Sequence, residues 1–234
     1  MRIDGPILAL DSSTSLGSVA VGDASGVFGE VTRNVAGGHS SALLPAVEQV
    51  MEAAGLKPGE LAGIVVGGGP GSFTGLRVAA ATAKGMLQAL HLPLFAYSGL
   101  LATAASAWAA AGPVCALFDA RRRDVYAACY EFPRTILPPT ALSIDEVVER
   151  FRGGEAPLFV GEGALLHREM LEGELGAVVG PAQLAAPRAS ALIWLAIHAP
   201  ELGRVADPAA WEPEYVRASG AVRVAARAAA GEAG

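Results

Sequence analysis

A glycine-rich segment, Gly67-Gly68-Gly69-Pro70-Gly71-Ser72-Phe73-Thr74-Gly75-Leu76-Arg77, is the most informative part of this chain. It follows the apolar run Ile64-Val65-Val66 and leads into an alanine-rich stretch with helical spacing. Five glycines in nine residues allow the backbone to turn sharply and to approach another group closely. A strand, a glycine turn and a helix start are typical of a site that holds a phosphate or another chain. The alternative is that the glycines only allow tight packing between strand and helix.

The segment matches none of the common nucleotide or nucleophile motifs. A P-loop places Lys-Ser or Lys-Thr after its last glycine, whereas Leu76 follows Gly75 here and the nearest lysine is Lys84. A dinucleotide fingerprint would need glycine at position 74, which is Thr74. Ser72 lacks the spacing of a nucleophile elbow. The sequence therefore leaves open what the glycines contact.

A second candidate site is the turn Asp11-Ser12-Ser13-Thr14, which follows the apolar strand 7–10. Backbone N–H groups and hydroxyls in such a turn can hold a phosphate, while the acid holds a metal ion through water. The same residues can equally form an Asx turn whose polar groups satisfy one another. The sequence does not choose between these two structures.

The first half of the chain is expected to alternate strands with helices. The pattern predicts strands at 7–10, 18–21, 27–35, 62–66 and 93–97, and helices at 40–54, 73–90 and 100–111. The helix at 40–54 is capped by Ser40 or Ser41 and has Pro45 near its first turn. Its inward stripe is Leu43, Leu44, Val47, Val50, Met51 and Ala54. Apolar burial along this stripe or presentation of a face to a partner are both compatible with the spacing.

A pattern then repeats. The strand 114–119 ends in Asp119 and a strand returns at 125–130, as the first strand ends in Asp11 and a strand returns after it. Two copies about 108 residues apart indicate an internal duplication. Beyond them we expect a linker at 133–139, strand 158–161, and helices that open at Ser143 and span 165–171 and 190–198. The predicted lobes are residues 1–110 and 111–199, with a segment at about 200–220 packing back on the first.

Composition excludes several classes of protein. The net charge of −6 makes the chain a poor nucleic-acid binder by itself, because phosphate contacts need clustered Lys and Arg. No apolar stretch approaches the roughly 20 residues that cross a bilayer, so we expect a cytoplasmic protein without membrane contact. Cys115 and Cys129 lie in apolar runs and are predicted to be buried free thiols. The basic cluster Arg121-Arg122-Arg123 is interpreted as a solvated loop tip, with a nucleic-acid contact as the alternative.

The histidines indicate no metal site. The four histidines are His39, His91, His167 and His198, and none has a partner ligand at metal-binding spacing. No Ser-His-Asp or Cys-His arrangement can be proposed from spacing either. We therefore expect neither a metal nor a catalytic residue in this chain.

Several of these motifs together resemble the bacterial TsaB family of tRNA threonylcarbamoyladenosine biosynthesis proteins. The resemblance is carried by segments 7–14, 39–45 and 67–78, and by Phe118-Asp119-Ala120-Arg121-Arg122-Arg123-Asp124-Val125-Tyr126 and Pro213-Glu214-Tyr215-Val216-Arg217. The glycine segment followed by Ser-Phe-Thr-Gly-Leu-Arg is its most specific part. The match covers most of the chain and is densest over residues 7–130.

The resemblance implies an α/β fold, the duplicated actin-like ATPase (ribonuclease H-like) fold, with two lobes of mixed sheets and flanking helices. It implies a non-catalytic relative of the transferase TsaD, acting in the formation of N6-threonylcarbamoyladenosine beside the anticodon of tRNAs that read codons beginning with A. The expected partners are TsaD in a heterodimer, TsaE in a ternary complex, a second copy of the chain when TsaD is absent, and tRNA indirectly.

The resemblance also places candidate residues. A vestigial nucleotide cleft is expected at Asp11, Ser12, Ser13, Thr14, Gly68 and Gly69, with room for weak binding of ATP or ADP. The partner interface is expected on the first two helices, at His39, Ser40, Leu43, Val47, Met51, Phe73 and Arg77. No cofactor is expected to be required by this chain, although the complex uses ATP.

One further feature separates this chain from the catalytic relative. The resemblance implies that the catalytic relative TsaD has a metal-binding histidine pair on the helix after its fifth strand, whereas the matching place here, residues 97–102, has no histidine. The competing interpretation is an ATP-dependent phosphotransferase or a metallopeptidase of the same fold, for which Asp119 would be the candidate acid. A stand-alone small-molecule binding protein is a third interpretation.

Overall fold

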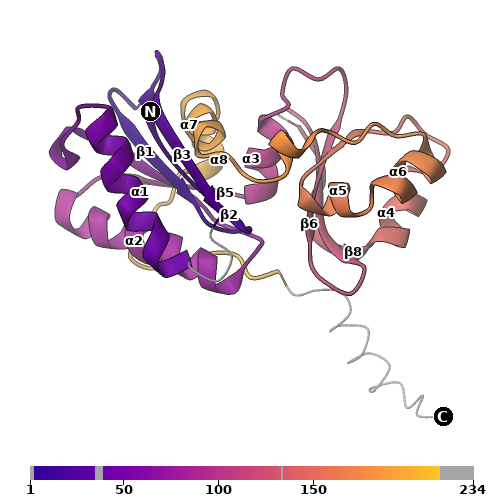
Figure 1. Ribbon diagram of the computed structural model, residues 1–234. Coiled ribbons are helices and arrows are strands. Elements are labelled where there is room, and N and C mark those ends of the chain that lie inside the picture. Colours follow the sequence, from indigo (N-terminus) through magenta and orange to yellow (C-terminus); the bar gives the residue numbers. More distant parts are fainter. Residues whose placement is uncertain (1–2, 35–38, 133, 217–234) are drawn as a thin grey trace, which may run out of the picture. The chain divides into compact units, whose positions relative to one another are not determined.

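The computed structural model describes residues 3–34, 39–132 and 134–216, and of residues 39–42 the backbone only. The chain divides into two compact units (Figure 1). Of the described residues, the first unit comprises 3–34, 39–106 and 186–214, and the second comprises 107–132, 134–185 and 215–216. Each unit is built on one sheet.

The first unit has a five-stranded mixed sheet in the order β3-β2-β1-β4-β5. Its strands are β1 (Ile7–Asp11), β2 (Leu16–Asp23), β3 (Gly26–Asn34), β4 (Gly63–Gly67) and β5 (Leu94–Tyr97). The meander β1-β2-β3 is antiparallel, as the short turns predict, whereas β4 and β5 run parallel to β1 after helical crossovers.

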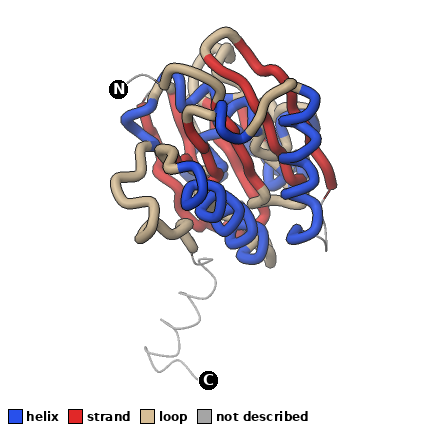
Figure 2. The backbone as a smooth tube through the Cα atoms, turned by 90° about the vertical axis from the view of Figure 1, so that its left-hand side faces the viewer, coloured by secondary structure: helices blue, strands red, loops and turns tan. Residues whose placement is uncertain are grey.

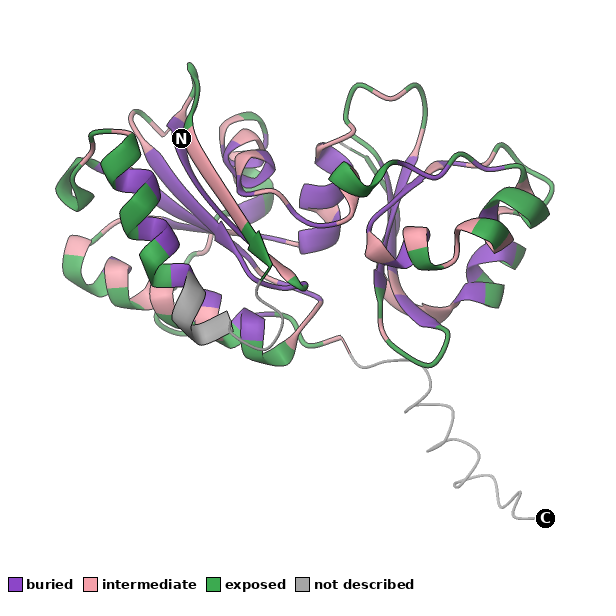
Figure 3. Ribbon diagram, in the orientation of Figure 1, coloured by how far each residue is buried: buried purple, intermediate pink, exposed green. Residues whose placement is uncertain are grey.

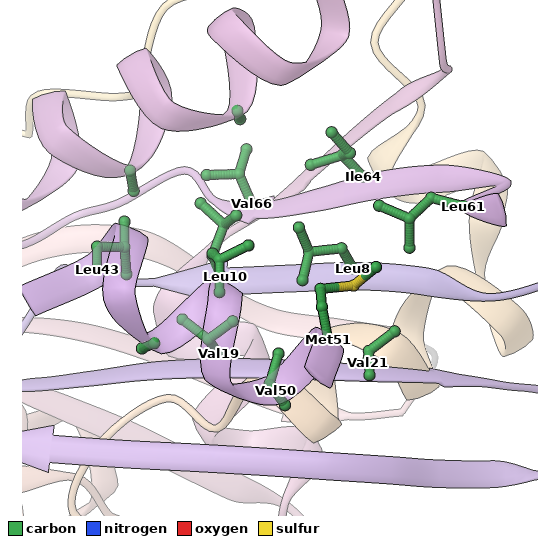
Figure 4. Close-up of a cluster of buried hydrophobic side chains, with 14 of the residues drawn as sticks. Leu8, Leu10, Val19, Val21, Leu43, Val50, Met51, Leu61, Ile64 and Val66 are labelled. Carbon is green, nitrogen blue, oxygen red and sulfur yellow. The ribbon is translucent and has the colours of Figure 1, made fainter. Parts of the chain in front are cut away.

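Helices cover both faces of this sheet (Figure 2). The helices α1 (His39–Ala53) and α2 (Phe73–Leu90) pack on Leu8, Leu10 and their neighbours in β2 and β4 (Figure 4). On the other face α3 (Gly99–Ala105) and α7 (Ala189–His198) pack on Ile7 and Ala9. Residues 7–10 of β1 are all apolar, and alternate residues of a strand point to opposite faces, so β1 is apolar on both faces. Short helices at Pro58–Glu60 and Pro200–Gly203 (α8) complete the unit.

The second unit repeats the first four strands of this topology. Its sheet has the order β8-β7-β6-β9, with β6 (Val114–Asp119), β7 (Asp124–Glu131), β8 (Arg134–Ser143) and β9 (Leu158–Val160). The pairs β6-β7 and β7-β8 are antiparallel and β6-β9 is parallel, as in β1-β2, β2-β3 and β1-β4. The duplication inferred from the two strand–acid–strand segments is thus present in the strand order.

Helices α4 (Ile144–Phe151), α5 (Glu162–Leu166) and α6 (Arg168–Leu175) cover one face of the second sheet, and a short helix at Ala182–Leu184 follows. The α4 helix begins with the predicted capping pattern, because Ser143 Oγ accepts the Glu146 N–H while the Glu146 carboxylate accepts the Ser143 N–H. Cys115 and Cys129 are directly opposed on β6 and β7, and both are buried free thiols, as predicted.

Three predicted elements are wrong in extent or type. The expected linker at 133–139 belongs largely to β8, because its apolar residue Leu137 is 4% exposed and packs in the core of the second unit. The helix expected to reach residue 111 ends at Ala105. The helix expected at 165–171 is two helices, α5 and α6, which meet at His167.

The predicted lobe boundary also differs from the structure. Residues 186–199, which we assigned to the second lobe, belong to the first unit. Polar contacts explain part of this placement: Glu30 of β3 accepts hydrogen bonds from Ser190, Ser18 and Arg188, and Ser18 Oγ accepts the Ala189 N–H. Leu192 and Leu195 add buried apolar contacts on the same sheet face. No described helix has the length and apolar character that a membrane crossing needs.

Candidate functional site

The turn after β1 is closed on itself. Asp11 Oδ1 accepts hydrogen bonds from the Ser13 N–H at 2.9 Å and the Ser13 hydroxyl at 2.8 Å. Ser12 Oγ donates to the Gly75 carbonyl at 2.8 Å, and Thr14 Oγ1 donates to the Leu16 carbonyl at 3.2 Å. The four side chains from Asp11 to Thr14 are between 0% and 4% exposed. Of the two structures that the sequence left open, the chain adopts the Asx turn, in which the three hydroxyls and one of the two Asp11 carboxylate oxygens are bonded within the chain.

The second carboxylate oxygen of Asp11 is a buried atom without a hydrogen-bond partner among the described residues. Burial raises the pKa of Asp11 to about 6, against which the two Ser13 hydrogen bonds act. A Cβ added to Gly67 would lie 1.7 Å from Asp11 Oδ2. Glycine at position 67 is therefore required by the Asp11 side chain.

The glycine segment lies in contact with the Asp11 turn. The Ser72 N–H donates to the Ser13 carbonyl at 2.6 Å, and a Cβ on Gly71 would lie 2.2 Å from that same carbonyl oxygen. Ser72 also caps α2, because its Oγ accepts the Gly75 N–H. The segment thus joins the turn to the start of α2 through backbone contacts.

The same segment holds residues 211–214. The Glu214 N–H donates to the Gly68 carbonyl at 2.8 Å. Gly69 has φ +103°, and a Cβ there would lie 2.6 Å from the Glu214 carbonyl oxygen. Trp211 packs beside Gly68, and Pro213 is buried. Residues 211–214 lie in the segment at about 200–220 that we expected to pack back on the first lobe.

The structure therefore brings Asp11, Ser12, Ser13, Thr14, Gly68 and Gly69 together, as predicted for a nucleotide cleft, but uses them differently. The three hydroxyls already donate within the chain, and none of them is more than 4% exposed. In this arrangement the side chains do not fit a phosphate group. Across residues 3–34, 39–132 and 134–216, no cluster of three or more metal-ligating side chains occurs.

The predicted partner face needs a correction. Leu43, Val47 and Met51 are 2%, 5% and 5% exposed and pack into the core between α1 and the sheet. Leu43 and Met51 are labelled in Figure 4. These three side chains face inward because they carry the apolar stripe of α1, so they cannot meet a partner in the folded chain. The side chains of His39 and Ser40 lie outside the described residues.

The outer surface of the two helices offers other residues. Leu44, which we expected to face inward, is 52% exposed, and Phe73 at the start of α2 is 54% exposed. Exposed residues, green in Figure 3, occur along both helices. Arg77 is also exposed, and its guanidinium lies 4.2 Å from the centre of the Phe73 ring. Pro45 lies inside α1 beyond its first turn, on the same exposed side as Leu44. We call Leu44, Phe73 and Arg77 the outer helix face.

Two sheets of repeated topology, each opened by a strand–acid–strand hairpin, place this chain in the class of actin-like ATPase (ribonuclease H-like) folds. The model of the TsaD family, tRNA N6-adenosine threonylcarbamoyltransferase, matches residues 23–156. The chain belongs to the TsaB family of tRNA threonylcarbamoyladenosine biosynthesis proteins, as its relatives show.

One relative is the TsaB protein of Bacillus subtilis, which is 31% identical over 218 residues, covering 90% of this chain and 93% of the relative. The TsaB protein of Escherichia coli is 34% identical over 130 residues, covering 53% of this chain and 54% of the relative. The solved structure of YeaZ from Pseudomonas aeruginosa superposes with a TM-score of 0.76 at 26% identity, covering 91% of this chain and 100% of that chain.

Proposed function

We propose that this chain is a non-catalytic subunit of the complex that forms N6-threonylcarbamoyladenosine, and that it binds and activates TsaD. Its membership of the TsaB family supports the pathway. The observation that carries the non-catalytic role is the closed turn from Asp11 to Thr14, whose hydroxyls are buried and already bonded within the chain. Phosphoryl transfer depends on groups that are free to position the phosphates of the nucleotide.

The outer helix face is the proposed docking surface for TsaD. Leu44 and Phe73 supply exposed apolar surface on two helices that pack together, and Arg77 supplies a charge that fixes orientation. In the absence of TsaD, the same face would join two copies of the chain. Because one face serves both, TsaD and the second copy compete by mass action.

We further propose the features that the family resemblance implies. TsaE joins the pair formed with TsaD, the complex consumes ATP, and this chain needs no cofactor of its own. The target is the adenosine beside the anticodon of tRNAs that read codons beginning with A. The reaction takes place in the cytoplasm.

A reconstitution tests this function. Purified TsaD, TsaE, tRNA, ATP and the threonylcarbamoyl adenylate donor are combined with and without the chain, and the modified nucleoside is quantified by mass spectrometry. We expect product only when the chain is present, and no ATP hydrolysis by the chain alone. Hydrolysis by the purified chain would instead support the phosphotransferase, and peptide cleavage would support the peptidase.

Matched variants test the docking surface. Leu44→Asp and Phe73→Ala are expected to weaken TsaD binding by about tenfold or more each, since buried apolar anchors dominate interfaces. Leu202→Asp is the control, because Leu202 is 54% exposed on α8, away from both helices. Calorimetric titration of each folded variant with TsaD gives the affinities. If all three variants bind TsaD with the affinity of the wild type, the docking surface does not include Leu44 and Phe73.

A further inference from the structure

The turn between β6 and β7 carries three consecutive arginines in the left-handed backbone region. Arg121, Arg122 and Arg123 have φ of 69°, 54° and 67°. The one other non-glycine residue with positive φ in the described part of the chain is His91, which ends α2, where that conformation is common. Residues with a Cβ are disfavoured in this region, and glycine is not. A turn that only connected two strands would be more stable with glycine at these positions.

The surrounding backbone holds the turn in this conformation. Asp119 Oδ1 accepts the Arg121 N–H at 2.7 Å, and the Asp124 N–H donates to the Arg121 carbonyl at 3.0 Å. The Ile144 N–H at the start of α4 donates to the Arg123 carbonyl at 3.0 Å. Strained backbone persists where its surroundings fix it, and such strain gathers at functional sites. The hairpin thus presents arginine side chains from a rigid base.

Two of the three guanidinium groups are available to a ligand. Arg123 pairs with Asp145 at 3.0 Å. Arg121 and Arg122 are exposed, and neither forms an ion pair with a carboxylate in the described part of the chain. Asp119, two residues before Arg121, uses Oδ1 for the backbone of the turn. Guanidinium groups present paired N–H donors that match the oxygens of a phosphate.

We propose that Arg121 and Arg122 form a contact site for backbone phosphates of RNA. The proposal rests on the proposed function, since an RNA partner is expected for a subunit of a tRNA-modifying complex. The chain has a net charge of −6, so the site would hold one or two phosphates while the rest of the RNA is held by partner subunits. The arginines then remain at strained positions because they bind, although they cost stability.

This opposition between stability and binding provides the test. The double variant Arg121→Gly with Arg122→Gly is expected to raise the Tm of the chain by about 2–4 °C, because glycine relieves the left-handed strain. The same variant is expected to weaken tRNA binding by the assembly with TsaD about tenfold at low salt. The slope of log K against log salt should fall by about 1–2, as one or two phosphate contacts are lost.

Two controls accompany it. Arg150→Ala with Arg204→Ala removes the same charge from exposed positions outside the turn and is expected to leave tRNA affinity within about twofold. Arg121→Lys with Arg122→Lys keeps the charge and is expected to retain most of the salt slope. A merely structural turn predicts the same gain in Tm for the glycine variant without any change in tRNA affinity.

The outcomes separate this inference from the proposed function. If the reconstituted reaction needs the chain but the glycine variant binds tRNA as tightly as wild type, the proposed function stands and only the arginine inference is overturned. If the chain forms no assembly with TsaD, the proposed function fails, and the same variants are compared for tRNA binding by the chain itself, where equal affinities overturn the inference. The glycine variant could instead bind TsaD more weakly while each assembly binds tRNA as tightly as before. That result would assign the arginines to contact with an acidic protein surface and would also overturn the inference.

Discussion

The carboxylate of Asp11 lies against the Cα of Gly67, so closely that a Cβ on residue 67 would be 1.7 Å from Asp11 Oδ2. The two residues are 56 positions apart and end the neighbouring parallel strands β1 and β4. The first glycine of the glycine segment is thus explained by a contact within the chain. The equivalent acid of the second unit, Asp119, also accepts the N–H two residues onward, but it is exposed.

The pH dependence of stability should report on Asp11. Its pKa is raised from 3.8 to about 6 in the folded chain, so the unfolded chain releases this proton at lower pH than the folded chain does. The free energy of unfolding therefore falls as pH rises from about 4 to about 6, by roughly 3 kcal/mol from this group, and is then constant with respect to it. Asp11→Asn removes the titration and keeps an acceptor for Ser13.

Urea denaturation of both proteins between pH 4 and 8 gives the measurement. The stability of Asp11→Asn relative to wild type should increase across pH 4–6 and level off above it. A difference that stays constant over the whole range would show that Asp11 ionises in the folded chain as it does in water.

Gly69→Ala should release the segment at 211–214. The added Cβ would lie 2.6 Å from the Glu214 carbonyl oxygen at a residue with φ +103°. We expect a loss of roughly 2 kcal/mol or more in stability and faster hydrogen exchange at the Glu214 amide. Gly85→Ala is the control, because Gly85 lies in α2 with open space around its Cα and should gain up to about 1 kcal/mol. Unchanged exchange at Glu214 in Gly69→Ala would contradict the predicted release.

Two substitutions in α1 should separate core from surface. Val47→Asp places a carboxylate in the core, since Val47 is 5% exposed, and is expected to cost roughly 3 kcal/mol or more or to prevent folding. Leu44→Asp is expected to change stability by no more than about 0.5 kcal/mol, since Leu44 is 52% exposed. Thermal unfolding checks both. Comparable losses for the two variants would show that Leu44 is also packed.

The two cysteines should be unreactive in the folded chain. Burial raises the pKa of the Cys115 thiol, and the hydrogen bond with Cys115 lowers the pKa of the Cys129 thiol. Both thiols are buried, so exclusion of the reagent protects them in the folded chain. We expect a disulfide reagent to label neither thiol until the second unit opens, and to label both rapidly in denaturant. Rapid labelling of the native chain, or the absence of two free thiols in denaturant, would contradict this.

Much of the first unit was predictable because its local signals agree. The apolar strand before Asp11, the glycines after Val66 and the capping serine Ser72 each match the element that forms there. The repeat around Asp119 gave the second sheet. Helix α1 was located correctly, but its spacing assigned Leu44 to the inward stripe together with Leu43, Val47 and Met51, and the family resemblance placed the last three on a partner face. Periodicity defines a stripe without saying which surface covers it.

The strand β8 was missed because Pro138 and Pro139 are typical of a linker, and β8 lies at the edge of its sheet, where proline is tolerated. The assignment of α7 to the first unit was missed because it depends on Glu30, more than 150 residues away in sequence. Contacts of that range leave no local pattern. The predicted cleft residues gathered as expected, but their hydrogen bonds could not be inferred from residue types.

The sequence by itself determined the repeated α/β topology, the family and the polar turn at Asp11, because strand periodicity, glycine placement and capping residues act over a few neighbouring positions. Only the tertiary structure decided what the glycines contact and where the hydroxyls donate. Those choices depend on backbone atoms brought together from residues 11–14, 67–75 and 211–214, whose distances are set by packing of the whole first unit.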